Sequence, residues 1–319
     1  MTKTITKKIT MPRTAYLKKE ERSEIKEILD SVKFPSRFNF LSDHKGLRTR
    51  EISLLIAPKG GSKSTLVKTI LSDLAASQKQ CYVLLSEEDP QSFLYALNQG
   101  FESMLSDAST SEKFLNNIFV QNQSEIPRGL TTSISGFINY LREMVIALGI
   151  KAIIFDNIST SFLTRFRIDV QQQAIEELKE LAIELDIAFL IVIHTAKGTN
   201  IQRNLFSGED VRGNMASSNI ASYIYALHTY FNCNPPRSFI YTDKARYHRQ
   251  ANKQVYELEF DNKTGLFLKD KKSSYDTLLN MISNRKQRKG VNENRGESVE
   301  YIFKSEKPSR KEQNDFLNW

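Results

Sequence analysis

Short apolar runs alternate with amphipathic stretches over residues 51–270, and this pattern constrains the fold of the 319-residue chain most strongly. The runs show little polar alternation, which is typical of strands buried on both faces of a parallel sheet. The sequence therefore predicts an α/β fold: a mostly parallel, twisted sheet with helices on both faces. The predicted strands are Ile52–Ala57, Cys81–Ser86, Asn117–Val120, Ala152–Asp156 and Phe189–His194, and the predicted helices are Lys63–Ser77, Pro90–Leu105, Ser133–Leu148 and Val170–Leu185.

The pattern changes after residue 220, where strand-like runs follow one another through short turns. We expect these runs to be antiparallel strands added to one edge of the sheet. They are Tyr223–Tyr230, Ser238–Lys244, Gln254–Phe260 and Leu266–Lys269. Three regions follow: a basic segment at 1–40 with a linker-type helix over Lys18–Val32, a core domain at 41–270, and a basic, flexible tail at 271–319 that begins with a short helix at Tyr275–Ser283.

Positive charge is concentrated at the two ends of the chain. Residues 1–50 hold 13 lysines and arginines against 6 acidic residues, and residues 271–319 hold 11 against 7, within a net charge of +8. Basic flanks favour a polyanionic partner, nucleic acid before membrane, although solvated tails would look the same. No apolar run reaches the ~18 residues of a membrane span, and no signal peptide is recognisable, so we expect a cytoplasmic protein. Two cysteines, Cys81 and Cys233, exclude a multi-disulfide framework.

A strand-to-helix loop is the most informative motif. The predicted strand Ile52–Ala57 runs into the loop Ala57-Pro58-Lys59-Gly60-Gly61-Ser62-Lys63-Ser64-Thr65. Consecutive N–H groups at a helix N-terminus form an anion site suited to a di- or triphosphate. We expect Lys63 to reach the β/γ oxygens and Ser64 to hold Mg²⁺. The motif is a degenerate G-x-x-x-x-G-K-[ST], because Ala57 and Ser62 replace its glycines. A Gly-rich turn without a ligand is the alternative.

Three other predicted strands end in polar residues that suit ATP hydrolysis. Asp156 ends a strand about 90 residues after Lys63 and is a candidate Mg²⁺ ligand. Glu87 and Glu88 follow the Cys81–Ser86 strand, and one of them would polarise the attacking water, unless both serve only to begin the next helix. His194 ends a further strand and is a candidate γ-phosphate sensor. Parallel strands bind ligands at their carboxyl ends, so these side chains are expected to converge.

These motifs together resemble the RecA-like ATPases, most closely the plasmid RepA and DnaB-type hexameric replicative helicases, over roughly residues 40–260. The resemblance rests on Gly46-Leu47, the Ala57–Ser64 loop, Glu88-Asp89-Pro90, Asp156, His194-Thr195-Ala196-Lys197-Gly198, Arg212-Gly213 before a Ser/Ala-rich helix, and Lys244-Ala245-Arg246. It implies a RecA-like P-loop NTPase fold, with an ATPase domain at 41–270 that uses ATP and Mg²⁺.

The resemblance also implies roles for particular residues. Lys244 and Arg246 would reach across a subunit boundary to the neighbour's γ-phosphate, as arginine fingers do. A RepA-like register makes Glu88 the catalytic base, whereas a recombinase-like register favours Glu87. The Lys18–Val32 helix would dock on the adjacent subunit; the alternative is that it covers its own sheet.

In such rings, the loops after the Asp156 and His194 strands line the central channel. The first loop, Asn157–Asp169, contains Arg165, Phe166 and Arg167, and paired arginines beside an aromatic ring suit single-stranded DNA without sequence choice. A solvated helix start is the alternative. The second loop, Thr195–Arg212, is long and polar, and long loops in compact domains are usually functional. It supplies the further candidate DNA contacts Lys197, Arg203 and Arg212.

The resulting functional prediction is an ATP-driven motor on single-stranded DNA. It is a ring-forming, hexameric replicative helicase of a plasmid, phage or mobile element, with other replication proteins as further partners. The first alternative is a RecA-like recombination ATPase, which would share every catalytic residue. The second is a non-unwinding partition or signalling ATPase, because the loop is also similar to the K-G-G-x-G-K-[ST]-T loop of ParA/MinD proteins, although one residue shorter.

Overall fold

The computed structural model describes residues 22–23, 34–43, 45–104, 112, 114–195, 205, 207–211, 216–231 and 233–282. The chain divides into two compact units, Met1–Leu279 and Asn280–Trp319. The predicted Lys18–Val32 helix lies outside the described residues except at 22–23, and the tail beyond residue 282 also lies outside them. Residues 275–282 are helical, in agreement with the short helix predicted there.

The described residues of the first unit build a nine-stranded sheet in the order β3-β2-β4-β5-β1-β6-β7-β8-β9. Its parallel part confirms the predicted α/β class. The first five strands in chain order pair in parallel and are almost completely buried on both faces, as their unbroken apolar composition predicted. They are β1 (Ile52–Ala57), β2 (Cys81–Leu85), β3 (Ile118–Asn122), β4 (Ala152–Asp156) and β5 (Ala188–His194).

The strand β6 (Tyr223–Tyr230) corrects one prediction. It pairs in parallel with β1, with Tyr223 opposite Ser53, so it belongs to the parallel part of the sheet. An apolar run does not reveal its own pairing direction, because direction depends on which distant strand it meets. The three strands after β6 are antiparallel, as predicted: β7 (Arg237–Ala245), β8 (Val255–Asp261) and β9 (Leu266–Ser273).

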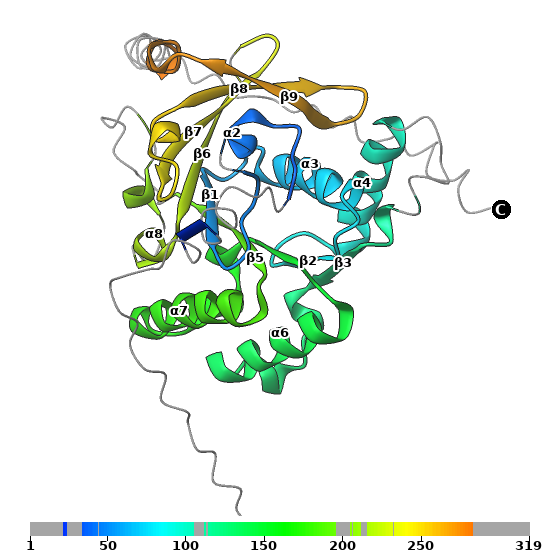
Figure 1. The fold of residues 1–319 in the computed structure, drawn as a ribbon. Helices are drawn as coiled ribbons and strands as arrows, with labels where there is room; N and C mark the ends of the chain where they lie inside the picture. Colours follow the sequence, from blue (N-terminus) through cyan, green and yellow to red (C-terminus); the bar gives the residue numbers. More distant parts are fainter. Residues whose placement is uncertain are drawn as a thin grey trace, which may run out of the picture. The chain divides into compact units, whose positions relative to one another are not determined.

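Long helices cover both faces of the sheet, and Figure 1 shows α3 and α4 on one face with α6 and α7 on the other. Helix α6 begins at an N-cap, Ser133, whose Oγ accepts from Gly136 N at 3.1 Å, and ends at Gly149 with φ 64°. Such caps satisfy terminal backbone groups and fix where the helix begins and ends. The long helices are α3 (Lys63–Ala76), α4 (Pro90–Met104), α6 (Ile134–Leu148) and α7 (Ile168–Leu185), and the short ones are α2 (Asn39–Ser42) and α8 (Ala216–Ile220).

The segment before β1 packs on its own subunit. Asp270 on β9 accepts hydrogen bonds from the backbone N–H of Asn39 at 2.7 Å and of Phe40 at 2.9 Å. Phe38 and Phe40 are fully buried in the core beside Tyr256. Residues 34–43 therefore cover the sheet of their own chain, while the position of the predicted Lys18–Val32 helix lies outside the described residues.

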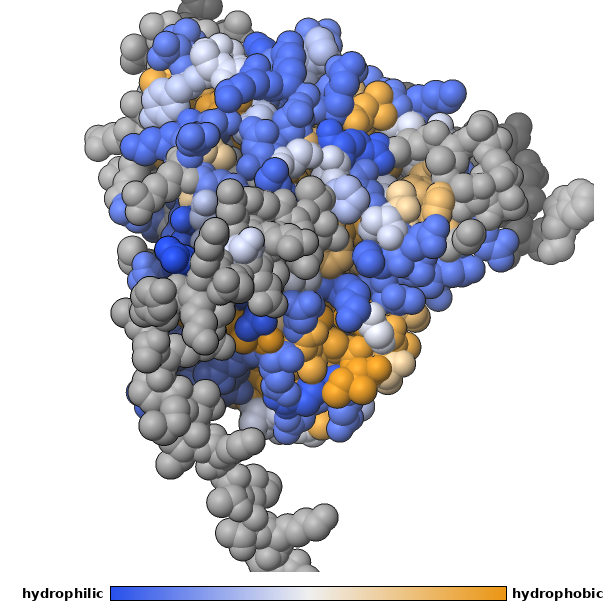
Figure 2. Space-filling view, in the orientation of Figure 1, coloured by the Kyte–Doolittle hydropathy of each residue, from blue (hydrophilic) through white to orange (hydrophobic). Residues whose placement is uncertain are grey.

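Most of the face seen in Figure 2 is hydrophilic, and apolar side chains gather on it over α6. Ile146 on α6 is 67% exposed, and Ile183 on the neighbouring α7 is 42% exposed. In the part of the chain that the structure describes, no helix is both long and apolar enough to span a bilayer.

Candidate nucleotide-binding site

The predicted site residues come from four strands that are neighbours in the sheet. The order β2-β4-β5-β1 places the four carboxyl ends side by side. Leu85 on β2 pairs with Asp156 on β4, and His194 on β5 pairs with Ala57 on β1, so the strand ends are level. The structure thus brings the loop, the glutamates after β2, Asp156 and His194 to one edge, where parallel sheets bind ligands. We call this the carboxyl edge.

The loop between β1 and α3 adopts the tight turn that its glycines permit. Gly60 has φ 73°, and Ser62, the residue before α3, also has a positive φ of 62°. A Cβ on Gly61 would lie 2.9 Å from Pro58 O, so glycine is required at that position. Ser62 replaces the motif's glycine at a left-handed position, which costs roughly 1–2 kcal/mol. The degenerate motif therefore forms the turn at a cost in strain.

Lys63 is folded against the loop. Its Nζ donates to Pro58 O at 2.6 Å and to Ala57 O at 3.2 Å, and the residue is only 6% exposed. Burial lowers the pKa of Lys63 to about 8, although the charges of Asp156 and Glu87 act to raise it. A buried ammonium held by two neutral carbonyls is poorly compensated, and an anion in the loop would stabilise it.

Ser64 and Asp156 form the predicted magnesium site. Ser64 Oγ donates to Asp156 Oδ2 at 2.9 Å, across 92 residues of sequence. Burial raises the pKa of Asp156 to about 6, against the lowering effects of the Ser64 hydrogen bond and Lys63. A hydroxyl beside a destabilised buried carboxylate is an oxygen donor set that suits Mg²⁺. The residues present therefore fit the ion.

The two glutamates differ in their contacts. Glu88 pairs with Lys68 of α3, with Oε1 2.8 Å from Nζ, and Lys68 also lies over the Phe93 ring. Glu87 instead turns along the carboxyl edge, with its Oε1 3.7 Å from His194 Nε2 and its side chain 45% exposed. Asp89 begins the next helix, because its Oδ2 accepts from Ser92 N at 2.9 Å. Capping thus falls to Asp89, which leaves both glutamates available for other roles.

Sequence reasoning missed two residues that brace this edge. Ser86 Oγ accepts from Asn157 N at 3.0 Å, so it ties the end of β2 to the segment after Asp156. Gln123 donates to Ser86 O at 3.1 Å and accepts from Phe162 N at 2.7 Å. Neither residue belongs to a recognisable motif, and only the strand order brings them to the site.

Lys244 and Arg246 lie at the opposite end of the sheet, which we call the amino edge. Lys244 pairs with Ile224 near the start of β6, level with the start of β1. Lys244 Nζ donates to Ser218 O at 2.9 Å, and Arg246 Nη2 donates to Asn219 O at 3.0 Å, both at the end of α8. Burial, and then the charge of Arg246, lower the pKa of Lys244. These two side chains therefore do not meet the phosphate loop of their own chain.

A buried carboxylate also organises the amino edge, and no motif announced it. Glu51 precedes β1 and accepts from Lys179 Nζ at 2.5 Å and from Tyr247 OH at 3.0 Å. The Ser222 hydroxyl donates to the same carboxylate. An acidic residue before a strand looks solvated in sequence, but here it is 9% exposed.

The predicted DNA loops are described in part. The first contains two 3-10 turns, Ile158–Thr160 and Phe162–Arg165, and Leu163 is buried within it. Arg165 and Arg167 are exposed, while Phe166 is half-buried with its ring edge-on to Phe162. Arg167 forms a solvent-exposed ion pair with Asp169 at 3.3 Å. In the second loop, Lys197, Arg203 and Arg212 lie outside the described residues.

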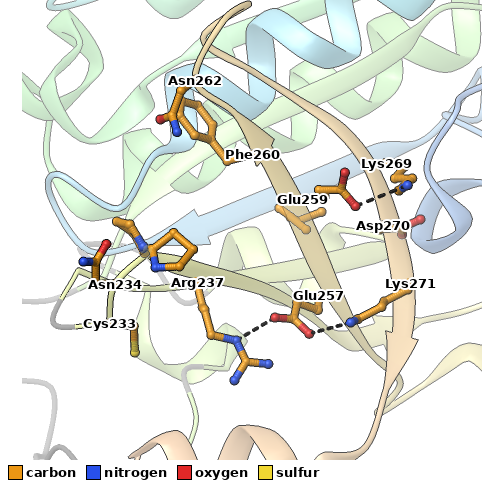
Figure 3. Close-up of a pocket in the computed structure, with 13 residues that line it drawn as sticks. Cys233, Asn234, Arg237, Glu257, Glu259, Phe260, Asn262, Lys269, Asp270 and Lys271 are labelled. Carbon is orange, nitrogen blue, oxygen red and sulfur yellow. Dashed lines mark hydrogen bonds and ion pairs between the residues drawn. The ribbon is translucent and has the colours of Figure 1, made fainter.

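A pocket of about 370 Å³ lies elsewhere, on the antiparallel strands (Figure 3). Its charged side chains are already paired with one another: Glu257 accepts from Arg237 at 2.6 Å and lies 3.5 Å from Lys271. Among the residues that the structure describes, none of the predicted site residues lines it. The pocket is therefore not the candidate nucleotide site.

Comparison with solved structures identifies the fold. The ATPase domain of a DnaB-like helicase superimposes with a TM-score of 0.60 at 15% identity, covering 78% of this chain and 95% of that one. A second structure, a DnaB-like replicative helicase described together with its interactions with primase, gives the same TM-score and identity but is covered over only 64% of its length. The fold is RecA-like.

A third solved structure extends the comparison beyond helicases. The RadB recombinase matches with a TM-score of 0.54 at 13% identity, covering 73% of this chain and 97% of that one. The sequence matches no protein-family model and no curated protein. The RecA-like fold is thus shared with proteins of more than one activity, and function has to be argued from the site.

Proposed function

We propose that this chain is a Mg²⁺-dependent ATP hydrolase that drives a motor on single-stranded DNA. The observation that carries the proposal is the convergence of the Lys63 loop, Asp156, Glu87 and His194 at four adjacent strand ends. We further propose a hexameric replicative helicase of a plasmid, phage or mobile element, working in the cytoplasm with other replication proteins. The helicase domains among the similar structures support this reading.

The loop residues Ala57 to Thr65 would hold the triphosphate. Backbone N–H groups at the start of α3 face the anion, and Lys63 exchanges its two loop carbonyls for phosphate oxygens. Ser64 and Asp156 would hold Mg²⁺, which neutralises charge on the β- and γ-phosphates. Regaining a compensating charge on each side of the site relieves the burial of Lys63 and Asp156.

Glu87 is the general base in this proposal. Its carboxylate lies beside His194 and its charge acts on both Lys63 and Asp156. Glu88 is instead held by Lys68, and it supports the position of α3 against β2. Glu87 would take a proton from the attacking water at Oε1, while His194 senses the γ-phosphate from the neighbouring strand.

The remaining charge on the transferring phosphoryl group would be met from a second copy of the chain. Lys244 and Arg246 are at the amino edge, away from their own loop, and Arg246 is exposed. In a ring, the amino edge of one subunit would face the carboxyl edge of the next, which is a head-to-tail contact that closes by rotation. Arg165, Phe166, Arg167, Lys197, Arg203 and Arg212 are the proposed contacts to single-stranded DNA.

The test is the rate of ATP hydrolysis with and without oligo-dT, together with displacement of a strand from a forked duplex. We expect DNA to stimulate the wild type, strand displacement to require ATP, and Lys63→Ala to abolish both. Stimulated hydrolysis without strand displacement would favour the recombinase alternative, which the RadB match supports. Hydrolysis indifferent to DNA would reject the motor and leave a partition or signalling ATPase.

A further inference from the structure

The segment that carries Arg246 is held on both sides by one buried carboxylate. Glu51 accepts from Tyr247 OH at 3.0 Å, and Tyr247 directly follows Arg246. Glu51 also accepts from the Ser222 hydroxyl, and the Ser222 carbonyl accepts from Arg246 N at 2.9 Å. Glu51 thus fixes both backbone neighbours of the arginine, one through the side chain of Tyr247 and one through Ser222.

The carboxylate itself is firmly anchored. Lys179 of α7 pairs with Glu51 at 2.5 Å, and the two side chains are 19% and 11% exposed. Such a charge is costly to bury unless several donors satisfy it, and here Lys179, Ser222 and Tyr247 do so. By contrast, Tyr247 is 44% exposed, and the Arg48 guanidinium lies 5.7 Å from its ring centroid. A buried anchor therefore supports a tyrosine at the surface, which is more than core packing requires.

Glu51 also connects this segment with the phosphate loop. It directly precedes β1, whose other end, Ala57, opens the loop that holds Lys63. A six-residue strand buried throughout is a rigid spacer. One strand therefore carries the loop of one predicted half-site at its carboxyl end and the support of the other half-site at its amino end.

We propose that Glu51 and Tyr247 are positioning residues that set the direction in which Arg246 leaves the subunit toward the phosphate loop of a second copy. The proposal rests on the function proposed above. Neither residue touches the nucleotide. Their effect is on the alignment of the guanidinium with the transferring phosphoryl group, to which rates are sensitive.

The experiment compares Tyr247→Phe and Glu51→Gln with wild type in steady-state hydrolysis and in ATP binding. Tyr247→Phe removes one hydroxyl without a cavity, so it keeps the test valid if Glu51→Gln unfolds. We expect kcat to fall by about tenfold, with the Kd for ATP changed by less than about twofold, because each variant's own loop is intact. Tyr275→Phe, also a half-exposed tyrosine on the antiparallel side, is the matched control and should leave both quantities unchanged.

Mixing with Lys63→Ala protein separates a positioning role from a structural one. Lys63→Ala subunits carry an intact amino edge, so mixed assemblies of Tyr247→Phe and Lys63→Ala should regain about a quarter of the wild-type rate, the share of correctly ordered interfaces. Wild-type kcat in both variants, or a defect that mixing does not relieve, would overturn the inference alone. If Arg246→Ala and Lys63→Ala also fail to complement each other, the proposed function fails with it.

Discussion

The two edges of the parallel sheet hold their charges in opposite ways. At the carboxyl edge, Lys63 is buried against neutral carbonyls and Asp156 against a hydroxyl, so burial shifts both pKa values toward neutrality. At the amino edge, Glu51 has three donors, while Lys244 and Arg246 rest on the carbonyls of α8. The carboxyl edge lacks compensation that a ligand would bring, whereas the amino edge is internally satisfied and presents cations outward.

This difference argues that one chain contains two half-sites instead of one complete site. A strand connects them, but the length of β1 keeps Lys244 and Arg246 at the end opposite to the loop. The predictions below test whether the two edges meet across subunits, how the carboxyl edge divides its work, and how the interior between the edges behaves.

The largest expected effect comes from disabling one edge at a time. Arg246→Ala and Lys63→Ala should each lower kcat for ATP by about 10³-fold, because each removes a charge that stabilises the transition state. An equimolar mixture should recover about a quarter of wild-type activity, since that fraction of interfaces joins an intact loop to an intact arginine. Phosphate release measures both. If Arg246→Ala alone stayed fully active, the amino edge would have no part in catalysis.

The next effect separates the two glutamates within the carboxyl edge. Glu87→Gln should lower kcat by about 10²-fold or more, as expected when a general base is removed, while ATP binding persists. Glu88→Gln serves as the matched change one residue away. Because Glu88 pairs with Lys68, its loss should cost less than about fivefold in kcat and act through stability. The reverse ranking in single-turnover assays would reassign the base to Glu88.

The smallest effect concerns the sheet interior between the edges. His228 on β6 is fully buried, and burial lowers its pKa to about 3. Since the unfolded state protonates near pH 6.5, stability should fall as pH drops below that value, by about 2 kcal/mol at pH 5. Urea unfolding at pH 7.5 and pH 5 measures the change. His228→Gln should lose this part of the pH dependence, and an unchanged acid limb in that variant would contradict the assignment.

The sequence predicted the parallel core well because burial on both faces leaves a local signature. β1 and β4 begin and end at the predicted residues, and the loop, Asp156 and His194 meet at one edge because parallel strands must align their carboxyl ends. The direction of β6 was wrong because pairing is a long-range property. The contacts of Ser86, Gln123 and Glu51 were invisible for the same reason: they depend on which strands become neighbours.

The central claim is that the loop around Lys63 holds a triphosphate beside Asp156. Equilibrium binding of a non-hydrolysable ATP analogue with Mg²⁺ tests it most directly, with wild type and Lys63→Ala compared at the same pH. The account predicts binding by the wild type in the micromolar range and a loss of about 10²-fold or more in the variant. No binding by the folded wild type, or equal affinity in both proteins, would contradict it.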